Sequence, residues 1–159
     1  MSHPSDDPEP LRYTGHLLRR AQQVHVAVWH REVSGEVSSV QFGALTVLDR
    51  TGATSQAELG AELFLDRSTI ADVVARMVRR GLLAREQDPD DGRRKRVTLT
   101  DEGRRVLAEL RPRVAGIEAT LTAGLDAGER AELRRMLRTM LAEAWERGPL
   151  MGRGSASGG

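Results

Sequence analysis

Residues 66–103 read D-R-S-T-I-A-D-V-V-A-R-M-V-R-R-G-L-L-A-R-E-Q-D-P-D-D-G-R-R-K-R-V-T-L-T-D-E-G, and the pattern of this segment changes halfway along. The first half has the three- and four-residue apolar spacing of one helix face, ended by Gly81. The second half places the turn signal D-P-D-D-G between two short segments typical of strands. A helix running directly into a basic hairpin indicates a winged helix-turn-helix, a mainly α fold of the α+β class.

The polar side of the predicted helix is a candidate DNA-reading face. An α-helix fits the major groove, where hydroxyl groups reach phosphates or bases and arginine can bind guanine with two hydrogen bonds. Asp72 repels phosphate, although it can accept a hydrogen bond from the amino group of cytosine. The alternative is a solvated charged face on an ordinary helix. The predicted contacts on this face are Arg67, Ser68, Thr69, Asp72 and Arg76.

The hairpin loop is a second candidate contact, through Asp91, Arg93, Arg94 and Lys95. An arginine at the tip of such a loop can enter the minor groove, and a carboxylate two positions earlier can fix its direction. The alternative is a solubilising charge cluster with weak surface ion pairs. Spacing alone does not separate these two interpretations.

Composition narrows the classes of protein. The 159 residues suit one domain with a net charge of only +1, yet residues 76–105 hold ten basic and six acidic side chains, a local basic patch. The chain has no cysteine, which excludes disulfides and thiolate metal sites. No apolar run approaches the roughly 18 residues of a membrane helix, so we expect a cytoplasmic protein without membrane contact.

The rest of the chain predicts the element order α-α-α-α-β-β-α-α, with a turn over residues 49–53. We expect one domain over residues 11–147 between disordered tails. The apolar stripes on its first and last helices exceed what the central lobe can cover, so a second copy is the natural partner. Two such lobes would read half-sites roughly 10 base pairs apart. The expected divisions are tails at 1–10 and 148–159, a winged lobe at about 38–100, and dimerisation helices at about 11–35 and 101–147.

Several motifs together resemble the MarR family of bacterial transcriptional regulators. The resemblance runs from about Leu17 to Trp145. The motifs that carry it are S-S-V-Q-F-G-A-L-T-V-L, S-Q-A-E-L, D-R-S-T-I, R-R-G-L-L and D-P-D-D-G-R-R-K-R-V-T-L-T-D-E-G. The resemblance implies a homodimer in which the first, fifth and sixth helices pack together and two winged lobes read a palindromic operator, usually to repress transcription.

The resemblance also assigns roles. It implies that Arg93 enters the minor groove with Asp91 as its orienting partner, and that the recognition-helix contacts are Ser68, Thr69 and Arg76. Two positions depart from the family pattern. Phe64 stands in a turn where glycine or asparagine is commoner, and Asp72 stands where many members carry a neutral or basic residue.

The first helix suggests a ligand. It carries G-H-L-L-R-R-A-Q-Q-V-H-V-A-V-W-H at residues 15–30, with Arg19, His25, Trp29 and His16 as candidates. Arginine would clamp a carboxylate, histidine would meet a phenolic hydroxyl and tryptophan would supply a flat apolar wall. The alternative is a packed Trp29 and a core His25. This motif resembles the MarR branch that responds to phenolic acids such as protocatechuate, in which residues matching Arg19 and His25 hold the ligand.

We do not expect an enzyme, a cofactor or a metal site. The three histidines of the first helix lack the i, i+4 pairing of a zinc motif, and no set of nucleophile, base and orienting group is evident. Two other functions stay open: a metal-responsive winged-helix regulator, and an architectural protein that binds DNA without sequence preference.

Overall fold

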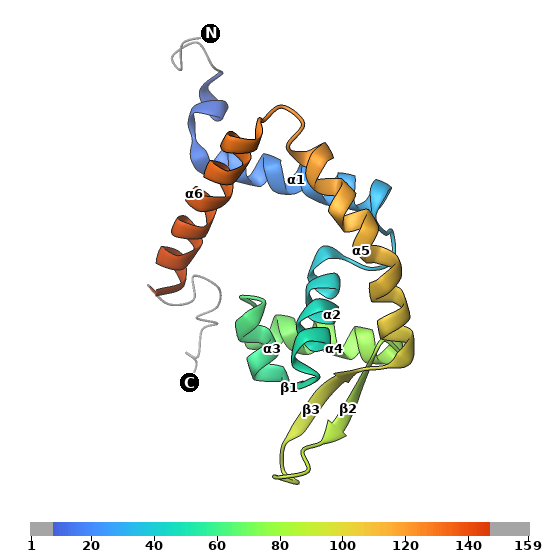
Figure 1. The fold of residues 1–159 in the computed structure, drawn as a ribbon. Helices are drawn as coiled ribbons and strands as arrows, with labels where there is room; N and C mark the ends of the chain where they lie inside the picture. Colours follow the sequence, from blue (N-terminus) through green and yellow to red (C-terminus); the bar gives the residue numbers. More distant parts are fainter. Residues whose placement is uncertain (1–7, 147–159) are drawn as a thin grey trace, which may run out of the picture.

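The computed structural model describes residues 8–146, which form a winged helix-turn-helix lobe carried by long helices (Figure 1). The predicted fold class is confirmed. The predicted tails, 1–10 and 148–159, lie almost wholly outside the described residues. In chain order the elements are η1 (Glu9–Arg12), α1 (Thr14–Glu32), α2 (Ser39–Thr51), β1 (Ala53–Ser55), α3 (Gln56–Glu62), α4 (Arg67–Arg79), β2 (Leu83–Gln87), β3 (Lys95–Leu99), α5 (Asp101–Leu121) and α6 (Ala127–Glu146).

Two elements differ from the predicted order. The short 3-10 helix η1 begins inside the stretch expected to be disordered. The expected turn at 49–53 is wrong, because α2 continues to Thr51 and only Gly52, with a φ of 78°, makes the turn before β1. Strand β1 pairs antiparallel with β3, placing the buried Thr54 opposite Val97. The sheet therefore has three strands in the order β1-β3-β2.

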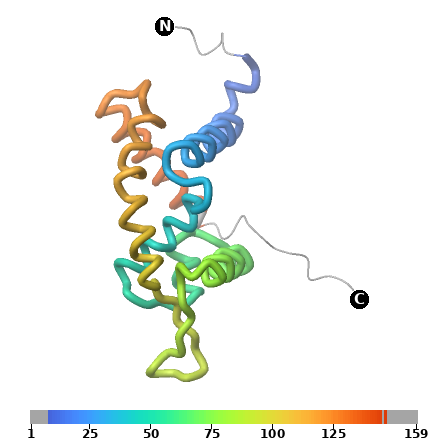
Figure 2. Tube along the Cα trace, turned by 90° about the vertical axis from the view of Figure 1, so that its right-hand side faces the viewer, coloured from blue at the N-terminus to red at the C-terminus, as the bar shows by residue number. Residues whose placement is uncertain are grey.

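The hairpin of β2 and β3 is the predicted wing. Leu83 pairs with Leu99 at its base and Gln87 with Lys95 near its tip. The base is buried against the helices, whereas the tip is exposed and projects from the lobe (Figures 1 and 2). Towards the base, the side chains of β3 alternate between faces, so that Val97 and Leu99 are buried and Thr98 between them is not.

Side-chain caps begin the helices of the lobe. Ser38 with Gln41 and Ser55 with Glu58 form capping boxes, in which each side chain accepts from a backbone N–H of the helix start. Three hydrogen bonds, one of them from the backbone of Ser55, lower the pKa of Glu58 to about 2. The second box lies within the S-Q-A-E-L motif and begins α3.

One apolar core joins the lobe to α5. Leu45 and Leu48 of α2, Met77 of α4 and Leu107 of α5 are among its most buried side chains. Trp29 joins this core from α1, and its indole Nε1 donates to the Val37 carbonyl at 2.7 Å. Helix α5 thus runs from the wing base to α1 and connects the two ends of the molecule (Figure 1).

Helix α6 lies beside α1, away from the wing (Figure 1). None of the α6 residues whose burial is described is buried. Large apolar side chains stay exposed on α1 and α6, so the end of the molecule opposite the wing has an uncovered apolar surface. These side chains are Leu17, Leu18, Val24, Val26, Met136, Met140 and Leu141.

Candidate DNA-binding surface and ligand cavities

The recognition helix α4 separates its two faces as its sequence predicts. Ile70, Val73, Val74 and Met77 are buried on its inner side. Packing this apolar side against the lobe leaves the polar side at the surface. All five predicted contacts are exposed: Arg67, Ser68, Thr69, Asp72 and Arg76.

The start of α4 is built around Asp66. Its Oδ1 accepts from the backbone N–H of Thr69 at 2.8 Å and from the Ser68 hydroxyl at 2.7 Å. Its Oδ2 accepts from the Thr69 hydroxyl at 2.7 Å. These bonds, the backbone one foremost, lower the pKa of Asp66 to about 2, so it is a carboxylate at neutral pH. Asp66 thus caps α4 and also binds both hydroxyl groups of its first turn.

The next turns of α4 carry Asp72 and Arg76. The guanidinium Nε of Arg76 donates to the backbone carbonyl of Asp72 at 3.3 Å. Within residues 8–146 neither side chain forms an ion pair. The carboxylate of Asp72 and the outer nitrogens of Arg76 therefore face solvent without a charged partner in the described part of the chain.

The turn before α4 confirms that Phe64 occupies an unusual position. Its φ is 54°, in the left-handed region that favours glycine or asparagine. The ring is 63% exposed, so core packing does not offset the cost of this conformation. The backbone geometry of the turn explains why glycine is the commoner residue there.

The wing tip holds Asp91, Arg93, Arg94 and Lys95, all exposed. Asp91 Oδ1 accepts from the backbone N–H of Arg93 at 3.1 Å, and its Oδ2 lies 3.5 Å from Arg94 Nε. The carboxylate thus fixes the backbone of Arg93 and the side chain of Arg94. This differs from the expected contact with the Arg93 side chain, which forms no ion pair within residues 8–146.

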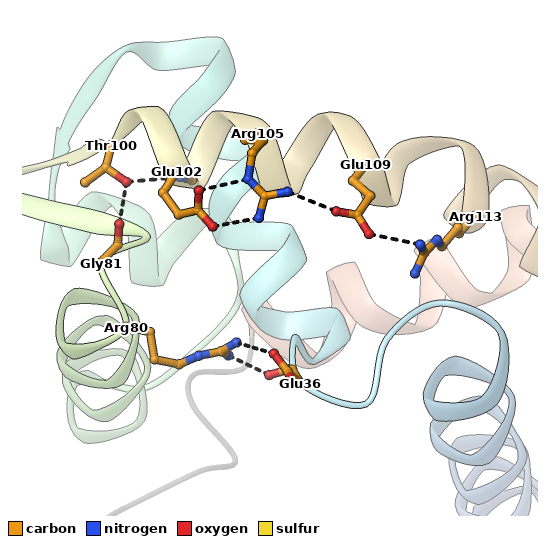
Figure 3. A network of polar contacts seen from close by, with 9 residues as sticks. Glu36, Arg80, Gly81, Thr100, Glu102, Arg105, Glu109 and Arg113 are labelled. Atoms are coloured by element: carbon orange, nitrogen blue, oxygen red, sulfur yellow. Dashed lines mark hydrogen bonds and ion pairs between the residues drawn. The ribbon is translucent and has the colours of Figure 1, made fainter.

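The lobe is held to the rest of the molecule by polar contacts at the end of α4 (Figure 3). Arg80 donates to the Glu36 carbonyl at 2.6 Å and lies 3.4 Å from its carboxylate. The Thr100 hydroxyl donates to the Gly81 carbonyl at 2.6 Å. Both contacts fix where the recognition helix ends relative to α2 and α5.

The loop between α1 and α2 receives side-chain donors from three helices. Trp29 of α1 binds the Val37 carbonyl, Arg80 binds that of Glu36, and Arg113 of α5 donates to that of Val33 at 3.1 Å. Glu109 accepts from Arg113 at 2.9 Å and continues this network along α5 to Arg105 (Figure 3). The loop therefore joins α1 and α5 to the end of α4.

The structure does not bring the four predicted ligand residues into one cavity. His16 and Arg19 contact each other at 3.4 Å, and Arg19 is exposed. The rings of His25 and Trp29 lie 6.0 Å apart at 57°. Because Trp29 is buried and bonded to the loop, it packs as the alternative interpretation expected rather than forming an open wall.

Two hollows nevertheless flank this pair of rings. One, of about 470 Å³, lies between α1, α5 and α6 and is lined by His25, Glu118, Arg130 and Arg134 among mainly apolar side chains. Among the described residues the buried Nε of Arg130 has no hydrogen-bond partner, whereas Arg134 pairs with Glu118 at 2.7 Å. Sequence analysis missed both arginines because the α6 face that meets α1 depends on the tertiary arrangement.

The second hollow, of about 300 Å³, lies between the end of α1, the following loop and α4. Trp29, His30 and Arg76 line it together with serine hydroxyls. Arg76 therefore belongs both to the predicted DNA-reading face and to the lining of a hollow. Of the four predicted ligand residues, His25 lines only the first hollow and Trp29 only the second. His16 and Arg19 line neither of the two.

No helix within residues 8–146 is long and apolar enough to cross a membrane. In the same part of the chain, no three His, Asp or Glu side chains gather closely enough to hold a metal ion.

Comparisons with known proteins agree with this geometry. The family model described as "MarR family" matches residues 36–94, from the loop between α1 and α2 to the wing tip. The HTH-type transcriptional repressor NicR of Pseudomonas putida is 36% identical over 128 residues, which are 80% of this chain and 81% of NicR.

Two solved structures extend the likeness to the whole fold. The PcaV transcriptional regulator of Streptomyces coelicolor, in complex with its natural ligand, is 40% identical with a TM-score of 0.82, covering 87% of this chain and 98% of PcaV. BpsR of Bordetella bronchiseptica, whose DNA binding is regulated by 6-hydroxynicotinic acid, is 36% identical with a TM-score of 0.72, covering 79% of this chain and 96% of BpsR. The chain belongs to the MarR family of transcriptional regulators.

Proposed function

We propose that the protein binds a palindromic operator as a homodimer, represses transcription there and is released by a small aromatic carboxylate. The observation that carries this proposal is that two candidate DNA-contacting elements lie on one lobe. The exposed polar face of α4 and the exposed basic tip of the wing belong to one lobe, and the uncovered apolar helices lie at the opposite end. Because the proposed target is chromosomal DNA, the protein would act in the cytoplasm.

The proposed homodimer uses the exposed apolar side chains of α1 and α6. A lone chain would leave Leu17, Val24, Met136 and Leu141 in water, where each exposed side chain forgoes on the order of 1 kcal/mol or more of burial energy. A two-fold pairing through this end would carry two wings and two recognition helices on the other side. Such a dimer matches a palindrome whose half-sites lie about one helical turn apart.

The proposed ligand site is the hollow between α1, α5 and α6. It contains His25, one of the predicted residues, and Arg130, whose guanidinium suits a carboxylate because its buried Nε has no hydrogen-bond partner among the described residues. Arg134 also lines the hollow and already pairs with Glu118 there. Its apolar side chains suit an aromatic ring. Support also comes from BpsR, because 6-hydroxynicotinic acid is a small aromatic carboxylate.

The proposed response follows from linkage. A ligand can release DNA only if it binds the DNA-incompetent arrangement more tightly than the competent one. A carboxylate among the dimerisation helices would change how α1 and α6 pack, and with them the separation of the two recognition helices. Arg19, which is exposed and does not line this hollow, enters the proposal through the resemblance to the phenolic-acid branch, in which the matching residue holds the ligand.

The experiment is protection of the promoter nearest the protein's own gene, repeated with a panel of aromatic acids. We expect a protected palindrome that one of the acids abolishes. Arg19→Ala and Arg134→Ala should keep the protection and lose the response to the acid, whereas Arg20→Ala, an exposed arginine on the same helix, should keep both. Joint loss of DNA binding and of the response in Arg19→Ala would contradict the ligand assignment.

The two other functions predict different results from the same footprint. A metal-responsive regulator would release the palindrome with a metal ion and ignore every acid. An architectural protein would protect all sequences alike. By contrast, an operator-reading regulator should prefer its site by on the order of 10³-fold or more at fixed salt.

A further inference from the structure

We propose that the first two turns of α4 present only hydrogen-bond acceptors to the DNA bases, through Ser68, Thr69 and Asp72. These residues then select bases that carry an amino group in the major groove, cytosine N4 or adenine N6. Arg76, a hydrogen-bond donor at the other end of the same face, then contacts a guanine further along the half-site. This inference rests on the proposed operator-reading function and names the chemistry of the operator.

The directions of the Ser68 and Thr69 hydroxyl protons decide what each hydroxyl can offer to DNA. A hydroxyl has one proton and two acceptor lone pairs. The Ser68 hydroxyl lies 2.7 Å from Asp66 Oδ1 and the Thr69 hydroxyl 2.7 Å from Asp66 Oδ2. An ionised carboxylate only accepts, so both protons point at Asp66. Each hydroxyl therefore offers only lone pairs to a third group.

At 3.6 residues per turn, positions 68, 69, 72 and 76 fall within roughly a third of the circumference of the helix. All four side chains are exposed. Arg67 falls outside this stripe, because it lies beside α3, where it lines a surface hollow with Gln56 and Ala61. Arg67 can thus serve a phosphate while the stripe reads bases.

Inside the major groove the Asp72 carboxylate meets repulsion from phosphates and from the acceptor atoms of guanine and thymine, and only an amino group offsets that cost. Asp72 has no ion pair within residues 8–146 that would neutralise it first. Asp72 therefore weakens binding to guanine and thymine as well as strengthening binding to cytosine and adenine. A specific interface excludes other sequences through such repulsive contacts.

The spacing of Asp72 and Arg76 along α4 gives the position of the guanine in the half-site. Asp72 and Arg76 are four residues apart, about 6 Å along the helix, which is less than two base-pair steps. The outer nitrogens of Arg76 can bind guanine O6 and N7 as a pair. The predicted half-site therefore has a cytosine or adenine followed within about two base pairs by a guanine.

The test is selection of binding sites from random DNA, with base preferences measured position by position for four proteins. Wild type should select cytosine or adenine at the position under Asp72. Asp72→Ala should reduce discrimination against thymine and guanine there by about tenfold and leave other positions unchanged. Thr69→Val should relax a neighbouring position in the same way. Asp90→Ala, which removes one exposed charge from the wing, is the matched control and should leave the preferences unchanged.

Asp66 is a positioning residue and needs its own readout. Asp66→Asn keeps one acceptor oxygen for the Thr69 backbone and the Ser68 hydroxyl but places a donor amide beside the Thr69 hydroxyl. The freed Thr69 hydroxyl proton should then admit guanine or thymine at the position under Thr69, and the thermal midpoint checks that the protein is folded. A purely structural cap would lower the midpoint and leave the base preferences alone.

Two outcomes would overturn the inference. One is selection of thymine or guanine under Asp72, and the other is an unchanged profile in both Asp72→Ala and Thr69→Val despite a clear wild-type site. If the wild-type protein selects no site at all, the proposed operator-reading function fails together with this inference.

Discussion

Gly103, the last residue of the L-T-D-E-G motif, has no room for a side chain in the first turn of α5. A Cβ atom there would lie 2.2 Å from the carbonyl oxygen of Leu82 and 3.2 Å from a methyl carbon of Leu99. The same carbonyl accepts from the backbone N–H of Thr100 at 3.2 Å. Gly103→Ala therefore forces the wing base or the helix to move by about 1 Å, since ordinary carbon contacts need about 3.5 Å.

The size of the effect follows from these contacts. Overpacking costs about 1–3 kcal/mol, and weakening the Thr100 hydrogen bond adds about 1 kcal/mol. The better helix propensity of alanine returns up to about 1 kcal/mol. We expect a net loss of about 1–3 kcal/mol in the free energy of unfolding.

Urea denaturation followed by circular dichroism would measure this loss, at one protein concentration because association also stabilises the fold. Gly116→Ala is the matched control in the same helix, because nothing lies within 4 Å of its added Cβ. The control should be neutral or more stable by up to about 1 kcal/mol. A Gly103→Ala protein as stable as wild type would refute the described packing of the wing against α5.

Three other perturbations give separate tests. Trp29→Phe leaves a buried loop carbonyl without its indole donor, and should lower the free energy of unfolding by about 1–3 kcal/mol in urea titrations. Arg93→Ala should weaken operator binding and reduce the preference for A·T pairs under the wing, measured by fluorescence anisotropy at several salt concentrations; an unchanged affinity would show that the wing tip does not touch DNA. The pKa of Glu58 is lowered from 4.5 to about 2, first by the backbone N–H of Ser55, so its stabilising contribution is present above pH 4.5 and lost as pH falls towards 2. Glu58→Gln should therefore lose less stability than wild type between pH 5 and pH 3, and equal slopes for both proteins would contradict this cause.

The recognition helix and the wing were predictable because their signals are local. Ile70, Val73, Val74 and Met77 repeat at helical spacing, and D-P-D-D-G marks a turn without reference to the rest of the chain. The caps at Ser55 and Asp66 depend only on neighbours three residues away. Each of these features forms from contacts within a few residues, so the local sequence is enough to predict it.

Strand β1 and the ligand cavity were not predictable for the opposite reason. Strand β1 is three residues long and exists because it pairs with β3, more than forty positions later. The hollow beside His25 depends on α6 folding back towards α1, which brings Arg130 and Arg134 to a histidine about a hundred residues earlier. The burial of Trp29 depends likewise on the loop carbonyl that it meets.

The most direct test of a two-fold operator reader changes only the spacing of its site. The measurement compares the affinity for a selected palindrome with the affinity for the same half-sites separated by five more base pairs, which turns one half-site to the opposite face of the duplex. A dimer joined through α1 and α6 holds its recognition helices about one helical turn apart, so the insertion should reduce affinity to the level of unrelated DNA. Equal affinity for both duplexes would contradict the account.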